Sequence, residues 1–197
     1  DIDDTLTGNS DGITPLLDFL KENRDSIGFG VATGRDLDSA VQVLETYGFE
    51  PPDVIISSVG TEIYYTKDKV TDRGWAAHIR KKWKPQIIRE TLENFHFLTL
   101  QENPEAQRSY KISYMLSDSI TPENALPLLH TALSDKKLSY KLILSHGVYV
   151  DILPYRASKG HAVRYLSRKW KIPLQRLLTA GNSGNDHSML SGRMRGI

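Results

Sequence analysis

The sequence predicts an α/β protein in which a parallel-sheet core is interrupted by an inserted α+β domain. Helix and strand signals alternate in the first third of the chain, the middle follows a helix-strand-strand order twice, and the last part returns to a helix followed by a strand. Alternation is typical of a parallel sheet with crossover helices, whereas the repeated middle order is typical of an antiparallel sheet. We therefore expect a core over residues 1–66 and 154–197, and an inserted domain over 67–153.

The first third of the chain carries the first helices and strands of the core. Thr14-Pro15 predicts a helix start, because Thr is a good cap and Pro fits a first helical turn. The segments that follow are either short and apolar or apolar at helical spacing. The expected elements are a helix from Thr14, a strand over 27–32, a helix over 37–47, a strand over 54–56 and a hairpin partner over 63–65.

The middle of the chain predicts the elements of the insert. Residues 75–94 form a basic, helix-like stretch that Pro85 kinks or breaks. Two half-buried strands, a helix that begins at Thr121-Pro122 and a hairpin follow it. Their expected ranges are 95–101 and 109–116 for the strands, 121–134 for the helix, and 138–145 with 148–153 for the hairpin around His146-Gly147.

The last part of the chain returns to the pattern of the core. Ser158 is a suitable cap for a helix whose apolar residues extend from Ala162 to Trp170. Residues 177–180 predict a strand, and a loop rich in Gly and Asn follows over 181–186. We therefore assign this part to the same parallel-sheet core as the first third.

Composition narrows the classes of partner. Lys and Arg number 25 and Asp and Glu 24, so the formal charge of +1 gives no electrostatic reason to expect nucleic acid or an anionic membrane. Hydrophobic residues make up 39% of the chain, which allows a core, but no apolar run approaches the ~20 residues of a membrane span. The absence of cysteine excludes disulfides and thiolate metal sites and fits a cytoplasmic location.

The first residues of the chain are rich in carboxylates. Alternate side chains of an extended segment project to the same side, so Asp1 and Asp3 can share a site. One carboxylate can attack as a nucleophile while the other handles protons and a shared cation. An acidic solvated turn is the ordinary alternative for such a segment.

Three further segments each offer a group that suits a phosphate or a cation. Thr33 precedes Gly34-Arg35 at a strand end and suits a phosphate. Lys159 opposes the helix dipole in a first turn, which indicates a use for its charge, and the oxygen-rich loop at 181–186 suits Mg²⁺. A helix cap, a solvated lysine and a plain turn are the ordinary alternatives. All four segments, however, fall at strand ends or helix starts on one sheet edge, where ligands of α/β proteins bind.

Together the four segments resemble the motifs of the haloacid-dehalogenase superfamily. Asp1-Ile2-Asp3-Asp4-Thr5 is similar to its first motif, Asp-x-Asp-x-Thr. Thr33 with Gly34-Arg35 resembles the second motif, Lys159 the third, and the loop at 181–186 the fourth. The resemblance implies a Rossmann-like parallel-sheet core of this type, with the insert in the position of the superfamily's type-two caps.

Further stretches are similar to sucrose-phosphate phosphatases and to the related domain at the C-terminus of sucrose-phosphate synthases. This resemblance extends over nearly the whole chain, and the stretches in the insert are those that favour the sucrose subgroup. The stretches are Ser58–Tyr64, Gln107 with Tyr110–Tyr114, Asp151–Pro154 with Lys159-Gly160, and Gly184–Asp186.

The resemblance implies a role for each matched residue. Asp1 would be the nucleophile that becomes an aspartyl-phosphate, Asp3 would protonate the leaving oxygen and then activate water, and Lys159 would complete the catalytic set. The phosphate would be held by Thr33, Gly34, Lys159 and Asn185, and Mg²⁺ by Asp1, Asp3 through its carbonyl, Asn182 and Asp186. The cap would close over the sugar, exclude water and select the substrate.

Two features depart from the superfamily's pattern. The fourth motif normally begins Gly-Asp, and this chain has Gly181-Asn182, whose amide is neutral and a weaker ligand than a carboxylate. The first motif normally follows a buried strand, and here the sequence opens on the motif and stops soon after the fourth. We therefore expect a piece of a longer protein, which leaves a fusion or association with a glucosyltransferase open.

The sequence thus predicts Mg²⁺-dependent hydrolysis of a small sugar phosphate, with sucrose 6-phosphate as the first expectation. Two alternatives stay open. One is a non-catalytic domain that binds sugar phosphate beside a synthase, which Asn182 favours. The other is a phosphatase of another substrate, such as a mannosyl or glucosyl phosphoglycerate.

Overall fold

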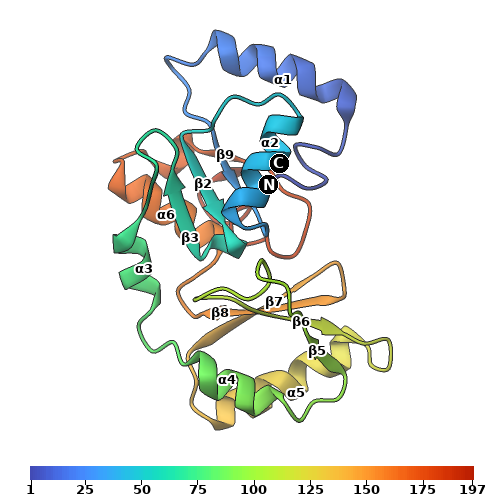
Figure 1. Cartoon of the computed structure of the whole chain (residues 1–197). Helices are drawn as coiled ribbons and strands as arrows, with labels where there is room; N and C mark the ends of the chain where they lie inside the picture. Colours follow the sequence, from blue (N-terminus) through green and yellow to red (C-terminus); the bar gives the residue numbers. More distant parts are fainter. The chain divides into compact units, whose positions relative to one another are not determined.

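The computed structural model describes residues 1–197, apart from the side chain of Ser10. The chain forms two compact units, of which the first comprises Asp1–Ala76 with Ser158–Ile197 and the second Ala77–Ala157. Both are built from helices and sheets, so the fold is mixed α/β (Figure 1). The sequence placed the limits of the insert at 67 and 153, and its interpretation as a cap stays a prediction.

The first unit contains a four-stranded sheet and a separate two-stranded one. Strands β1 and β2 are parallel, β2, β3 and β4 are antiparallel neighbours, and β9 and β10 form a parallel pair of their own. Strands β2 and β3 thus form the hairpin that the sequence predicts. The parallel pairs lie in two separate sheets, whereas the sequence predicts a single parallel sheet. The bounds are Gly30–Ala32 for β1, Val54–Ser57 for β2, Glu62–Tyr65 for β3, Val70–Thr71 for β4, Leu178–Thr179 for β9 and Arg195–Gly196 for β10.

Helices pack against the first sheet and enclose an apolar core. Ile2, at the start of the chain, is completely buried in this core beside Val31 and Ile55 of the two parallel strands. The site segments at both ends of the chain therefore belong to one folded unit. The helices of this unit are α1 Ser10–Glu22, α2 Leu37–Thr46 and α6 Lys159–Lys169, with a tight turn at Ser58–Gly60 and a 3₁₀ turn at Leu174–Arg176. Helix α3 Arg73–Ile79 crosses from the residues of the first unit into those of the second.

Two expected boundaries of the first unit are wrong. Helix α1 begins four residues before Thr14, because the Asn9 side chain accepts the backbone N–H of Asp11 at 2.9 Å and caps the helix there. Pro15 therefore lies inside the helix, where it removes one helical hydrogen bond. Strand β1 begins later than expected, since the N–H of Phe29 bonds the Asp53 carboxylate at 2.8 Å instead of a neighbouring strand.

The second unit is an antiparallel sheet, as the sequence predicts, and two helices cover one of its faces (Figure 1). The strand order is β5-β6-β8-β7. The helix-like stretch is broken before Pro85, which is one of the two expected outcomes, and a new helix begins at that proline. His146 and Gly147 both take the left-handed conformation that a tight hairpin turn needs. The bounds are α4 Pro85–Leu92, β5 Leu98–Leu100, β6 Ile112–Leu116, α5 Pro122–Asp135, β7 Tyr140–Ser145 and β8 Tyr149–Pro154.

Candidate active site

The buried residue Ile2 holds the segment Asp1 to Asp3 in place. The carbonyl of Ile2 accepts the N–H groups of Leu6 at 3.0 Å and Thr7 at 3.1 Å, which closes a turn directly after the segment. The backbone nitrogen of Asp1 donates to the carbonyl of Ala180 at 2.8 Å. The first motif is therefore fixed to the residue that follows β9.

Lys159 joins two carboxylates in the interior of the first unit. Its Nζ lies 2.8 Å from Oδ1 of Asp1 and 2.7 Å from Oδ1 of Asp186. The exposed fractions of the side chains are 0% for Lys159 and Asp186 and 6% for Asp1. Removing these charges from water is costly, so the cluster is stable only with its short charge-assisted hydrogen bonds in place. The sequence alone also allowed a solvated lysine at this position, and the structure excludes that alternative.

The start of α6 explains how Lys159 reaches this position. The hydroxyl of Ser158 caps the helix by accepting the N–H of His161 at 3.1 Å, as predicted. A Cβ atom on Gly160 would lie 2.0 Å from the carbonyl oxygen of Ser188, so only glycine allows the backbone of α6 to approach so closely. The third motif is thereby packed directly against the residues that follow the fourth.

Asp186 also organises the loop of the fourth motif. Its second oxygen, Oδ2, accepts the backbone N–H groups of Asn182 at 3.2 Å and Ser183 at 3.1 Å. The amide oxygen of Asn182 accepts the hydroxyl of Thr5 at 3.5 Å, which brings the first and fourth motifs together. Asp186 thus holds both the lysine and the loop, whereas Asn182 lies against the first motif.

The second motif lies beside the fourth. Thr33 is fully buried, and its hydroxyl accepts the N–H of Arg35 at 3.1 Å. The position of a Cβ on Gly34 would be 3.8 Å from the side-chain nitrogen of Asn185. The predicted phosphate-binding residues of these two motifs are therefore neighbours.

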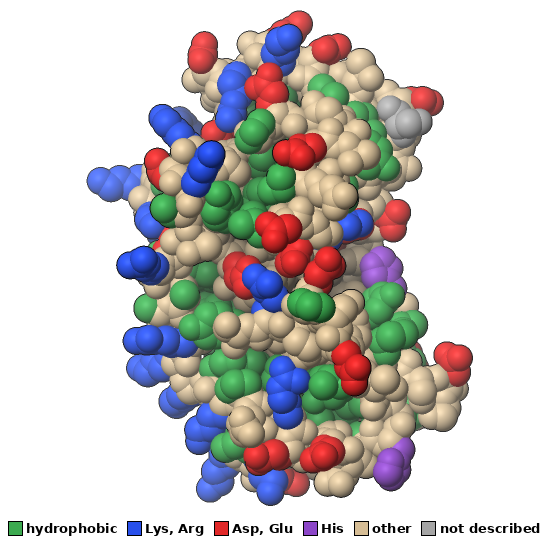
Figure 2. Space-filling model, viewed as in Figure 1, with side chains coloured by type: hydrophobic (Ala, Val, Ile, Leu, Met, Phe, Trp, Pro, Cys, Tyr) green, Lys and Arg blue, Asp and Glu red, His purple; other side chains and the backbone are tan. Residues whose placement is uncertain are grey.

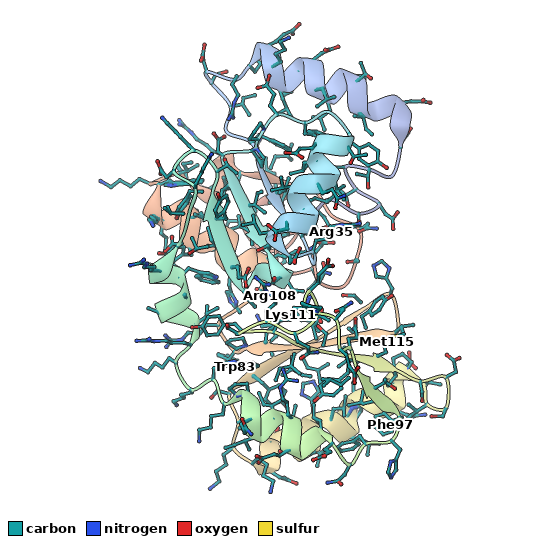
Figure 3. All side chains as sticks on the ribbon, in the orientation of Figure 1. Arg35, Trp83, Phe97, Arg108, Lys111 and Met115 are labelled. Carbon is teal, nitrogen blue, oxygen red and sulfur yellow. The ribbon has the colours of Figure 1, made fainter. Side chains whose placement is uncertain are left out.

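Arg35 is a partner of Asp3 that sequence reasoning did not assign. The guanidinium binds the Asp3 carboxylate in a fork, with Nε at 3.0 Å from both oxygens and Nη2 at 2.6 Å from Oδ1. Arg35 stands in the second motif (Figure 3), but nothing in the spacing of the chain indicated that it would meet the first. Asp3 is thus paired with Arg35, and Lys159 with the other two carboxylates.

The donor atoms of this site suit Mg²⁺. Within the described part of the chain, no group of three or more His, Cys, Asp or Glu side chains is arranged to hold a metal. The set expected from the sequence has a different composition, because it combines the carboxylates of Asp1 and Asp186 with the neutral oxygens of Asn182 and the Asp3 backbone. Such all-oxygen donors fit a hard cation.

The stretches of the insert that favour a sucrose subgroup meet on two paired strands. Ser113 of β6 pairs with Asp151 of β8, and the serine hydroxyl donates to the Asp151 carboxylate. The side-chain amide of Gln107 donates to the carbonyl of Ser113 at 2.8 Å. Ile112 and Tyr114 pack against α4 and α5, so the alternate residues of β6, Ser113 and Met115, lie on the opposite face of the sheet. Met115 is labelled in Figure 3.

The surface shows both signs of charge. Acidic and basic side chains occur on the visible face of each unit (Figure 2), in agreement with the formal charge of +1. Among the residues that the structure describes, none of the helices has the length and apolar character that a bilayer crossing requires.

Comparisons with known proteins identify the family. The sequence profile of the family described as sucrose-6F-phosphate phosphohydrolase matches residues 1–197. Sucrose-phosphatase 2 of Nicotiana tabacum is 33% identical over 202 residues, which cover 97% of this chain and 46% of the relative. Mannosylfructose-phosphate phosphatase of Agrobacterium fabrum is 27% identical over 200 residues, covering 100% of this chain and 79% of the relative.

A solved structure agrees over the same extent. The sucrose-phosphatase of Synechocystis sp. PCC6803, crystallised with sucrose and phosphate, superposes with a TM-score of 0.92 at 30% identity. The match covers 98% of this chain and 78% of that protein. The chain spans about half of the length of the tobacco relative.

Proposed function

Because the chain belongs to the sucrose-6F-phosphate phosphohydrolase family of haloacid-dehalogenase-like phosphatases, we propose that it hydrolyses a sugar phosphate, with sucrose 6-phosphate as substrate. The observation that carries the proposal is the buried Lys159, bonded to both Asp1 and Asp186. A fully buried ammonium shared by two carboxylates is a costly arrangement that a solvated helix end does not need. It suits a site that receives a phosphoryl group.

The proposed reaction begins with attack by Asp1. One oxygen of its carboxylate is held by Lys159, and the other has no hydrogen-bond partner among the described residues, which leaves it available for attack on phosphorus. The P–O bond to the sugar breaks as the Asp1 O–P bond forms, and the sugar oxygen takes a proton from Asp3. Asp3 then takes a proton from water, which attacks the aspartyl-phosphate and releases phosphate.

Asp3 must leave Arg35 to perform these proton transfers. In the fork with Arg35 it is a carboxylate that accepts hydrogen bonds, and only the protonated form can donate to a leaving oxygen. Both side chains are partly exposed, so the pair is weak enough to exchange. We propose that Arg35 orders Asp3 between turnovers, after Asp3 has released to solvent the proton that it took from water. Asp3 then takes up a proton from solvent as it leaves Arg35 for the substrate.

The remaining site residues would bind the phosphate or the metal and would not transfer protons. Thr33, Gly34, Lys159 and Asn185 would hold the phosphate group. Mg²⁺, held by Asp1, the Asp3 carbonyl, Asn182 and Asp186, would offset the charge between the carboxylates and the phosphate.

The proposal extends to the fold and to the second unit. The TM-score of 0.92 with a sucrose-phosphatase supports a Rossmann-like parallel core in which both parallel pairs take part. The second unit would act as the cap that selects the sugar, through the polar residues that β6 and β8 present opposite the helices.

Two alternatives have a specific observation behind them. The similarity to a mannosylfructose-phosphate phosphatase over the whole chain favours a related disaccharide phosphate. Asn182, in place of a carboxylate, favours a domain that binds sugar phosphate without hydrolysing it.

Phosphate release separates these possibilities. The full chain is incubated with sucrose 6-phosphate, mannosylfructose phosphate and glucose 6-phosphate, each with Mg²⁺ and with a chelator. We expect release from sucrose 6-phosphate that depends on Mg²⁺. Faster release from mannosylfructose phosphate would make that compound the proposed substrate in place of sucrose 6-phosphate. Equal rates with Mg²⁺ and with chelator would refute the role of the metal. Binding of a sugar phosphate without release of phosphate would favour the non-catalytic alternative.

A further inference from the structure

The loop Ser58–Gly60 has an unusual backbone next to the site. Its three residues have φ values of 51°, 59° and 89°, in the left-handed region, and they are buried. This conformation is unfavourable for Ser58 and especially for the β-branched Val59. Such strain persists where the surrounding structure enforces it. The contacts of this loop therefore identify the segments that keep it in this conformation.

One side of the loop is fixed to the second motif. The N–H of Ser58 donates to the carbonyl of Arg35 at 2.7 Å, and the N–H of Val59 donates to the carbonyl of Thr33 at 3.0 Å. These bonds bracket Gly34, and the Val59 side chain lies 4.0 Å from the position of a Cβ on that glycine. The loop thus sets the course of the predicted phosphate-binding segment.

The other side of the loop lies against the third motif. A Cβ atom on Gly60 would be 2.2 Å from the carbonyl carbon of Ser158 and 2.4 Å from the backbone nitrogen of Lys159. No side chain can occupy that space, so the Gly60 backbone lies directly on the peptide bond before Lys159. A displacement of Gly60 therefore displaces the start of α6.

Trp75 fixes Gly60 in turn. Its indole Nε1–H donates to the carbonyl of Gly60 at 3.1 Å, and the side chain is 1% exposed. The indole ring packs on the ring of Tyr165 in α6, with centroids 5.2 Å apart. Trp75 lies near the end of the first unit, and two residues later the second unit begins at Ala77.

Asp72 ties Trp75 to the same helix. Its carboxylate accepts the backbone N–H of Trp75 at 2.9 Å, the hydroxyl of Tyr165 at 3.0 Å and Nζ of Lys169 at 2.8 Å. Both Tyr165 and Lys169 belong to α6. The contacts form a closed frame that runs from α6 through Asp72 and Trp75 to Gly60 and back to the start of α6 at Lys159.

We propose that Trp75 is a positioning residue for Lys159, acting through its hydrogen bond to Gly60. The proposal rests on the proposed function, because the task assigned to Lys159 is to hold the substrate phosphate. Without the indole N–H, the Gly60 peptide can rotate and Lys159 loses its fixed place between the two carboxylates. The expected loss of phosphate affinity is about fivefold, the usual effect of one net hydrogen bond.

Calorimetric titration of the full chain with inorganic phosphate, in the presence of Mg²⁺, tests the proposal. Trp75→Phe keeps an aromatic ring and removes the donor. Trp83→Phe is the matched control, since the Trp83 indole also donates to a backbone carbonyl, that of Ser109 at 2.9 Å, within the second unit (Figure 3). We expect a weaker Kd for Trp75→Phe and an unchanged Kd for Trp83→Phe.

The same titration separates positioning from loss of structure. A purely structural role would lower the number of binding-competent molecules and leave their Kd unchanged, whereas a misplaced lysine weakens Kd at full stoichiometry. An unchanged Kd for Trp75→Phe would overturn the proposal. A parent chain that binds phosphate but does not hydrolyse sucrose 6-phosphate would refute the proposed function alone, and a parent that binds no phosphate would refute both.

A measurement on the unsubstituted chain tests the same proposal without requiring that the Trp75→Phe variant folds. The chain has three tryptophans, so its indole N–H groups give three resonances in a nitrogen-15 correlation spectrum. We expect the Trp75 resonance to shift on saturation with phosphate and Mg²⁺, because its acceptor lies against Lys159. Trp170, 41% exposed at the other end of α6, is the reference. A Trp75 resonance that moves no more than this reference would contradict the proposal.

Discussion

The two ionic clusters of the candidate site differ in burial. Lys159 and its two carboxylates are almost completely enclosed, whereas the side chains of Arg35 and Asp3 are 35% and 42% exposed. A buried cluster cannot exchange partners with water at low cost, while an exposed pair can. The difference matches the proposed roles, since a nucleophile has to be fixed and an acid-base group has to change partners.

The largest expected effect comes from breaking the buried cluster. Lys159→Met leaves two buried carboxylates without their cation and should lower the free energy of unfolding by about 3–5 kcal/mol. Denaturant unfolding in the absence of Mg²⁺ measures it, because an added cation could replace the lost charge. A change of less than about 1 kcal/mol would show that the cluster is far better solvated than the structure indicates.

A substitution at Asn182 tests the proposed Mg²⁺ site beside the buried cluster. Asn182→Asp adds a charged oxygen beside the first motif and should tighten Mg²⁺ by ~10–100-fold, as changes near metal sites typically do. Titration of phosphate release with Mg²⁺ would show a lower requirement for the metal. Strong release by the parent that the substitution leaves unchanged would mean that Asp186 already supplies what Asn182 lacks.

A third ionic cluster joins the buried carboxylate of Asp72, 1% exposed, to the ammonium of Lys169, whose side chain is 45% exposed. Burial raises the pKa of Asp72, but hydrogen bonds from Lys169, Tyr65, the Trp75 N–H and Tyr165 outweigh it and lower the pKa to about 2. Asp72→Asn should cost about 2 kcal/mol of stability at neutral pH, since it weakens charge-assisted hydrogen bonds.

The cost of Asp72→Asn should depend on pH with a definite sign. The pKa of the folded state lies below the ordinary value of 3.8, so the contribution of Asp72 is complete above about pH 4 and is lost as the pH falls through about 2. Melting curves of parent and variant should therefore converge between pH 4 and pH 2. A constant difference across that range would show that the contribution does not come from the ionised carboxylate.

The smallest expected effect comes from breaking the exposed pair. Arg35→Met should change the free energy of unfolding by less than about 1 kcal/mol, because both charges remain in contact with water. The same denaturant experiment as for Lys159→Met provides the comparison. Equal losses for the two variants would remove the distinction between a fixed and an exchangeable cluster.

The sequence predicted the order of elements well where local signals were strong. The antiparallel sheet of the second unit, the hairpin at His146-Gly147 and the Ser158 cap all follow from alternation, turn residues and capping chemistry. The start of α1 was missed because Thr14-Pro15 and Asn9 are both good caps, and only the fold decides between them. Local patterns also could not show that the parallel strands would divide between two sheets.

The sequence named several residues that the structure brings together, but it did not indicate how they pair. The motifs named Asp1, Lys159 and Asp186, yet the burial of Lys159 depends on close packing of α6 that no local pattern records. Arg35 pairs with Asp3 through a contact between segments that are distant in the sequence. The hydrogen bonds from the loop Ser58–Gly60 to the second motif depend on such a contact as well.

In the proposed mechanism Asp1, held by Lys159, attacks the substrate phosphate. Rapid acid quenching after mixing with sucrose 6-phosphate labelled in its phosphate group, in the presence of Mg²⁺, measures it directly. We expect transient label on the parent protein that hydroxylamine removes, and neither label nor phosphate release with Asp1→Asn. Phosphate release by Asp1→Asn at a rate close to that of the parent would contradict it.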